Sequence, residues 1–123
     1  MPELLRRRLV VACFALVLLL LATPAFAHAI LLSTTPGVDQ VVSGPNVPIE
    51  LRFNSRIDGK RSRLILVPPA GGAGTPLTIK EQSAPDTLAT QAEGLKSGTY
   101  TLRWQVLAND GHITRGEVSF RVQ

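Results

Sequence analysis

Apolar and polar residues alternate with a period of two along most of the chain after residue 28. Chain-breaking residues interrupt this alternation at Pro36-Gly37, Ser43-Gly44-Pro45, Asp58-Gly59 and the stretch Pro68–Gly74. Alternation of this kind is typical of strands that bury one face, and the interruptions predict turns between them. The region therefore favours strands over amphipathic helices.

The alternation predicts seven strands. We expect them at Ala29–Ser33, Val47–Phe53, Arg63–Val67, Leu77–Lys80, Thr87–Gln91, Thr99–Leu107 and Glu117–Val122. So many short strands in fewer than ~100 residues are typical of an antiparallel β-sandwich. We therefore predict an all-β fold, a seven-stranded antiparallel Greek-key β-sandwich.

The segment Thr99–Leu107 carries the clearest alternation. Its large apolar residues, Tyr100, Leu102, Trp104 and Val106, fall on one face, which we expect to be core. A binding platform built on Trp104 is the alternative, but the tryptophan is in register with the other apolar residues. The run before Tyr100 also resembles the tyrosine corner of Greek-key sandwiches, in which the phenol bonds back to the preceding loop.

The first 27 residues have the three parts of a secretory signal peptide. Arg6-Arg7-Arg8 form a positive segment, Leu9–Leu21 an apolar segment, and Ala25-Phe26-Ala27 a small-residue end. The apolar run is shorter than the ~20 residues that a spanning helix needs, although an uncleaved anchor is the alternative. We expect cleavage after Ala27, so that residues 1–27 are a signal peptide and residues 28–123 a mature domain in the periplasm.

Loss of the signal peptide would change the composition. Cys13 and Met1 are the only sulfur-containing residues, so residues 28–123 contain no thiolate or thioether ligand. The formal charge would fall from +4 to +2, because three arginines and Glu3 are lost. The remaining basic residues are mostly scattered and are not interleaved with aromatic ones, which argues against a nucleic-acid partner.

Candidate chemistry centres on histidine, which occurs only at His28 and His112. After cleavage His28 would begin the chain, where its α-amine and its imidazole Nδ1 can close one chelate ring around a metal ion. Asp110 stands two residues before His112, and an extended backbone with a flexible Gly111 would put both side chains on one face. The alternative is a β-turn with a surface histidine. If the first strand starts beside the end of Thr99–Leu107, all three side chains can share one ion.

This set of donors discriminates among metals. Three nitrogens and one carboxylate oxygen suit Cu(II), the strongest binder among the divalent ions, whereas Ca²⁺ and Mg²⁺ require more oxygen ligands. Zn²⁺ stays open as an alternative. Copper(I) prefers sulfur ligands, which residues 28–123 do not contain. We expect one Cu(II) per mature chain.

With these residues in view, the chain resembles the CopC family of periplasmic copper-binding proteins. The resemblance is carried by the start His28-Ala29-Ile30-Leu31, the turn at Ser33–Gly37, the strand at Pro45–Phe53, and the block Gly98–Val122 with its Asp-Gly-His motif. It implies a cupredoxin-like or immunoglobulin-like sandwich that binds Cu(II) through the amine and imidazole of His28 together with Asp110 and His112. It also implies a role in periplasmic copper handling, often beside a CopD-type inner-membrane protein.

The sequence departs from the family pattern in three ways. Ile113 follows the Asp-Gly-His motif, where the family commonly has a proline. The methionine-rich loop that holds copper(I) in some members is missing, so a two-site copper exchange is not expected. Asn54-Ser55-Arg56 stands in place of the family's usual acidic or proline-bearing segment.

Two other classes of function are open at this point. A copper monooxygenase also uses an N-terminal histidine and a second histidine. Here, however, Asp110 would fill a position that such an enzyme keeps open, and the single Trp and Tyr are assigned to the core. A metal-free interaction module would be unaffected by replacement of His28 or His112. We predict a monomeric protein that binds and buffers or delivers copper and is not an enzyme.

Overall fold

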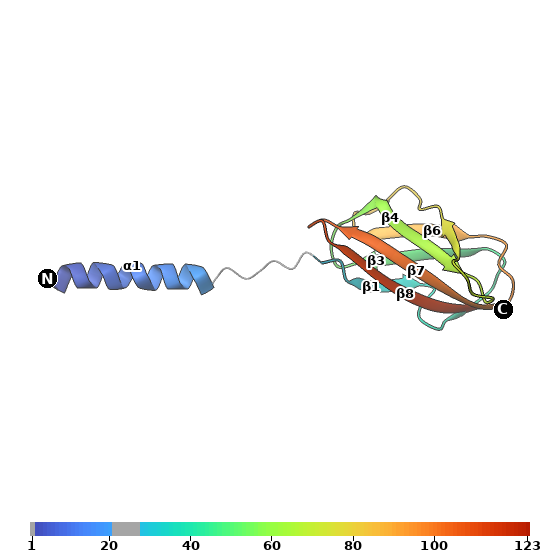
Figure 1. The fold of residues 1–123 in the computed structure, drawn as a ribbon, viewed down its shortest axis with the longest axis horizontal. Helices are drawn as coiled ribbons and strands as arrows, with labels where there is room; N and C mark the ends of the chain where they lie inside the picture. The colour runs from blue at the N-terminus through green and yellow to red at the C-terminus, as the bar shows by residue number, and fades with distance from the viewer. Residues whose placement is uncertain (1, 21–27) are drawn as a thin grey trace.

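The computed structural model describes residues 2–20 and 28–123 (Figure 1). Helix α1 covers Pro2–Leu20, and its side chains at residues 2–18 are exposed. In the described parts of the chain, α1 included, no helix has both the length and the apolar character needed to span a membrane. The bond after Ala27, where we expect cleavage, lies outside the described residues.

Residues 28–123 form two packed β-sheets, so the predicted all-β sandwich is confirmed. One sheet has three strands in the order β1-β3-β6, and the other has five in the order β2-β8-β7-β4-β5. The strands are β1 (Leu31–Thr35), β2 (Val41–Val42), β3 (Val47–Phe53), β4 (Ile57–Val67), β5 (Thr75–Leu77), β6 (Thr87–Ala92), β7 (Gly98–Ala108) and β8 (Ile113–Val122).

The strand count differs from the prediction, because this part of the chain contains eight strands. The additional strand, β2, has two residues and pairs in parallel with the end of β8, so the five-stranded sheet is not wholly antiparallel. Strand β1 begins at Leu31 rather than at the predicted Ala29. The strand predicted at Leu77–Lys80 lies earlier in the chain, since β5 ends at Leu77. Strand β3 has the predicted bounds.

The predicted turn at Asp58-Gly59 is wrong, since both residues lie inside β4. The pairing of β4 with β7 shifts register between Asp58 and Arg63, as in a β-bulge. Side-chain oxygens accept hydrogen bonds from backbone N–H groups in this irregular segment. The Gly59 N–H donates to Gln82 Oε1 at 3.0 Å, and the Lys60 N–H donates to Asp58 Oδ1 at 3.0 Å.

The core lies between the two sheets, where alternate residues of β3 and β7 are buried. Trp104 is 8% exposed and packs edge-on against Phe53, with ring centroids 5.4 Å apart, so its assignment to the core is confirmed. Gly116 faces Trp104 on the neighbouring strand, and a methyl group at this position would overlap the indole. The Tyr100 hydroxyl donates to Lys96 O at 2.9 Å, which confirms the tyrosine corner.

Candidate metal centre

The Asp110-Gly111-His112 stretch lies in the turn between β7 and β8, so the backbone is the β-turn considered as the alternative and is not extended. The Gly111 N–H donates to Ala108 O at 3.0 Å, and the Ala108 N–H donates to His112 O at 2.8 Å. Gly111 has φ of 85°, which lies in the left-handed region. This is the three-residue hairpin loop in which a type I turn is followed by a left-handed glycine. The chain reverses here because β7 and β8 are antiparallel neighbours.

The turn directs Asp110 and His112 toward each other. Asp110 Oδ1 accepts the backbone N–H of His112 at 2.9 Å, and Asp110 Oδ2 lies 2.9 Å from His112 Nδ1. The backbone hydrogen bond, more than any other cause, lowers the pKa of Asp110. Partial desolvation opposes this shift, while the nearby imidazoles of His112 and His28 favour it. The carboxylate is therefore held in its charged form and in a fixed orientation.

His28 reaches the same place from the other sheet. Ala29 is buried in the core at 1% exposure, so the chain enters the sandwich directly after His28. Figure 1 shows this start of the sandwich at the same end as the β7–β8 turn. His28 Nδ1 lies 3.8 Å from Asp110 Oδ2, and the rings of His28 and His112 have centroids 4.7 Å apart.

The three predicted site residues are thus brought together. One possible ligand atom from each of His28, Asp110 and His112 lies within 4.8 Å of the others. Ligands that share one transition-metal ion through bonds of ~2 Å are separated by up to ~4 Å, so a small side-chain rotation would close the site. The side chains of His28 and His112 are 51% and 66% exposed, which leaves them room for this rotation. In the full chain, the nitrogen of His28 belongs to the peptide bond with Ala27.

The sequence singled out the Asn54-Ser55-Arg56 segment but not the contacts of Asn54 with the backbone next to His28. Asn54, directly after β3, accepts the Ile30 N–H through Oδ1 at 2.7 Å, and its own N–H donates to Ile30 O at 2.9 Å. The available signal was the place of Asn54 at the end of a buried strand, where a polar side chain can bond to neighbouring backbone.

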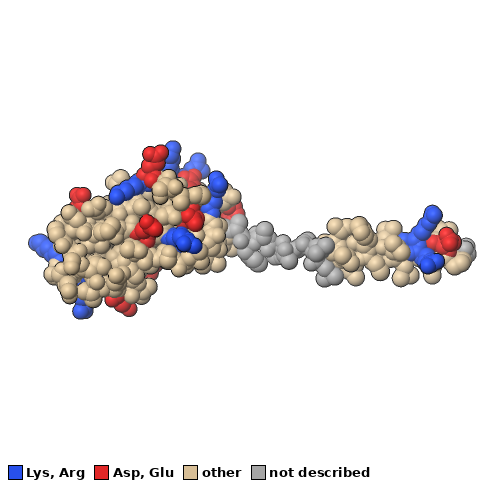
Figure 2. All heavy atoms as spheres, turned by 180° about the vertical axis from the view of Figure 1, so that it is seen from behind, with Lys and Arg blue, Asp and Glu red and all other residues tan. Residues whose placement is uncertain are grey.

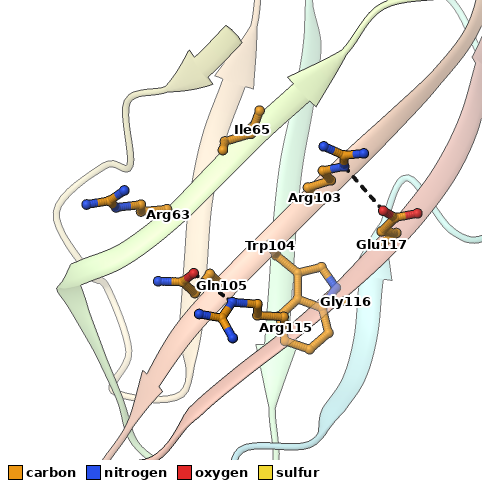
Figure 3. A pocket seen from close by; sticks show the side chains of 8 residues that line it. All are labelled: Arg63, Ile65, Arg103, Trp104, Gln105, Arg115, Gly116 and Glu117. Carbon is orange, nitrogen blue, oxygen red and sulfur yellow. Dashed lines mark hydrogen bonds and ion pairs between the residues drawn. The ribbon is translucent and has the colours of Figure 1, made fainter. Parts of the chain in front are cut away.

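Apart from this cluster, a pocket of about 400 Å³ lies on the five-stranded sheet (Figure 3). Arginines at its rim are engaged by neighbours: Arg103 Nε lies 3.2 Å from Glu117 Oε1, and Arg115 Nε donates to Gln105 Oε1 at 2.9 Å. The residues that line it include no histidine. Within residues 2–20 and 28–123, His28, Asp110 and His112 are the group that can hold a metal ion.

Charges elsewhere on the sandwich are mixed. On the face seen in Figure 2, Lys and Arg side chains lie near Asp and Glu side chains, with uncharged surface between these groups.

The fold and the cluster together define an all-β sandwich domain with a candidate metal centre at one end. A family model described as the CopC domain matches residues 31–123, a range that includes Asp110 and His112 and begins just after His28. The chain belongs to the CopC family.

Relatives and solved structures agree with this assignment. Copper resistance protein C of Xanthomonas campestris pv. juglandis is 31% identical over 111 residues, which cover 85% of this chain and 87% of the relative. The crystal structure of CopC from Methylosinus trichosporium OB3b superposes with a TM-score of 0.69 at 26% identity, covering 78% of this chain and 94% of that one. The structure of PcoC, a methionine-rich copper resistance protein from Escherichia coli, superposes with a TM-score of 0.64 at 27% identity, covering 79% of this chain and 100% of that one.

Family membership gives the chain a copper-related function. CopC proteins are copper resistance proteins and not enzymes, so the prediction of a non-enzymatic protein is confirmed and the monooxygenase alternative is set aside.

Proposed function

We propose that residues 28–123 form a periplasmic Cu(II)-binding protein that buffers or delivers copper. One Cu(II) ion is bound by the α-amine and imidazole of His28, the carboxylate of Asp110 and the imidazole of His112. The observation that carries the proposal is the convergence of these three side chains to within 4.8 Å at one end of a CopC-family sandwich.

The chemistry of the donors supports Cu(II) over other metals. Imidazole and amine nitrogens suit Cu(II), and one carboxylate reduces the net charge of the complex. The relative PcoC is methionine-rich, whereas this chain has only Met1, within the predicted signal peptide. Copper(I), which prefers sulfur ligands, therefore has no suitable donors in residues 28–123.

Export is part of the proposal, because the α-amine of His28 becomes available only when the bond after Ala27 is cut. The positive, apolar and small-residue segments of residues 1–27 support cleavage by signal peptidase. We further propose that the mature protein is a monomer and that it exchanges copper with a CopD-type inner-membrane protein.

Electron paramagnetic resonance tests the donor set. The mature protein, residues 28–123, is expected to bind one equivalent of Cu(II) and to give a tetragonal signal dominated by nitrogen ligands. A second equivalent should give the signal of loosely bound copper, because the described residues offer no second cluster of this kind. An intense blue-copper absorption band would contradict the proposal, since it requires a thiolate.

The affinity for Cu(II) is expected to fall as the pH decreases from 7 to 5. Protons compete with copper for the amine and both imidazoles, and imidazoles ordinarily titrate near pH ~6.5. The pKa of Asp110 is lowered, so its carboxylate stays charged over this range and adds no proton to the competition. Titrations against a chelator of known pH dependence would measure the slope. A constant affinity over this range would argue against histidine ligands.

A further inference from the structure

We propose that Asn54 is a positioning residue for the copper site, one that holds His28 in place beside Asp110 and His112 before the metal arrives. The inference rests on the proposed function, since it concerns the same site. Asn54 acts through the backbone of Ile30, two residues after His28.

The contacts of Asn54 fix the chain close to His28. The Ile30 N–H donates to Asn54 Oδ1 at 2.7 Å, and the Asn54 N–H donates to Ile30 O at 2.9 Å. Regular pairing of β1 with β3 begins only at Leu31, opposite Phe53, and is irregular up to Ser33. Asn54 therefore continues the attachment to β3 beyond the regular pairing, toward His28.

The segment that carries Asn54 is itself anchored on both sides. The Phe53 N–H donates to Asp86 O and the Ile57 N–H donates to Pro85 O, each at 2.9 Å. Between these points, Arg56 O accepts the Asn109 N–H at 3.2 Å, and Asn109 directly precedes Asp110. Residues 54–56 thus bond to both halves of the site, the segment after His28 and the β7–β8 turn.

This arrangement has a consequence for binding. His28 lies at the start of the mature chain, where backbone freedom is greatest unless contacts remove it. If a metal-binding residue becomes ordered only when the metal binds, the loss of conformational entropy weakens the affinity for the metal. A residue that is already ordered avoids this loss. The Asn54 side chain supplies one hydrogen bond to the neighbouring backbone that alanine cannot supply. The bond from the Asn54 N–H to Ile30 O and the burial of Ala29 are further restraints.

The test compares Asn54→Ala with Asn46→Ala in the mature protein. Asn46 is a matched control, because its Oδ1 also accepts a backbone N–H, that of Gly94 at 3.3 Å, but next to the opposite end of β3. Asn54→Ala is expected to lower Cu(II) affinity between about threefold and about tenfold, the range of one net hydrogen bond. Asn46→Ala should leave the affinity unchanged. In the metal-free protein, Asn54→Ala should also speed hydrogen exchange at the Ile30 amide.

A double-mutant cycle separates positioning from general stability. The background carries His28→Ala with one added glycine before it, so that residue 28 offers neither imidazole nor free amine. There Asn54→Ala should change the affinity no more than ~1.5-fold, because the remaining ligands lie on the β7–β8 turn. An effect as large as in the parent would overturn the inference. A retained acceptor gives a second test: Asn54→Asp should bind at least as tightly as the parent, and a loss equal to that of Asn54→Ala would also overturn it.

Failure of this inference and failure of the proposed function are distinguishable. If His28→Ala and His112→Ala lower the affinity while Asn54→Ala does not, the copper site stands and Asn54 has no positioning role. If both histidine variants bind copper as the parent does, the proposed site itself is wrong.

Discussion

Addition of one glycine before His28 is expected to weaken Cu(II) binding by about a hundredfold or more, ~2.7 kcal/mol, while the fold is unchanged. In the extended chain the nitrogen of His28 is a peptide nitrogen, as it is in the full-length chain with Ala27. The amine ligand and its chelate ring with Nδ1 are then lost. A competition titration of both proteins against a chelator of known affinity measures the difference.

The structure indicates why the extension should not disturb folding. His28 is exposed, and the sandwich begins with the buried Ala29 and the bonds of Ile30 to Asn54, which the extra residue leaves in place. Thermal melting of the two metal-free proteins is the control, and we expect the same midpoint. Equal copper affinities at equal stability would show that the α-amine is not a ligand, or that the mature chain does not begin at His28.

Replacement of His112 by alanine is expected to have a similarly large effect, a loss of about a hundredfold in Cu(II) affinity with fewer nitrogen couplings in the electron paramagnetic resonance spectrum. The variant removes an imidazole and leaves the rest of the turn intact. The hydrogen bond that orients Asp110 comes from the backbone N–H of His112, which alanine retains. The loss would therefore report the missing imidazole ligand rather than a displaced carboxylate.

The stability of the metal-free His112→Ala protein should change by no more than ~0.5 kcal/mol, because the side chain is 66% exposed and its removal leaves no cavity. Lys80→Ala is a suitable control, since Lys80 is an exposed residue outside the cluster. It should bind copper as the parent does. If His112→Ala and Lys80→Ala have the same affinity, His112 is not a ligand and the assignment of the site is wrong.

The sequence was most informative where one face of a strand is buried. In β3 every second residue is buried over Val47–Phe53, and the predicted bounds match the observed ones. A strand of two residues is too short to show an alternation of buried and exposed residues. The two residues of β2 are defined by pairing with Arg121 and Val122, about 80 positions later, and this partner cannot be inferred from local composition.

The turn signals were less dependable, because other parts of the fold can satisfy the same residues. The sequence Asp58-Gly59 is typical of a turn. In the structure Gln82, from another segment, accepts a hydrogen bond from the Gly59 N–H, and the chain continues in β4. At Asp110-Gly111-His112 the sequence left an extended segment and a β-turn open, and the structure has the turn. In both stretches glycine accepts either conformation, so the neighbouring strands decide.

For the candidate site, the sequence by itself determined the identity of the possible ligands. It contains only two histidines, it has an aspartate two residues from one of them, and it lacks sulfur after residue 27. Only the tertiary structure decided that these groups meet, through a β7–β8 turn that aims Asp110 and His112 at each other and through the bonds of Ile30 to Asn54. Donor chemistry is a property of each side chain alone, whereas proximity between residues 28 and 112 depends on how two sheets pack, which no local pattern records.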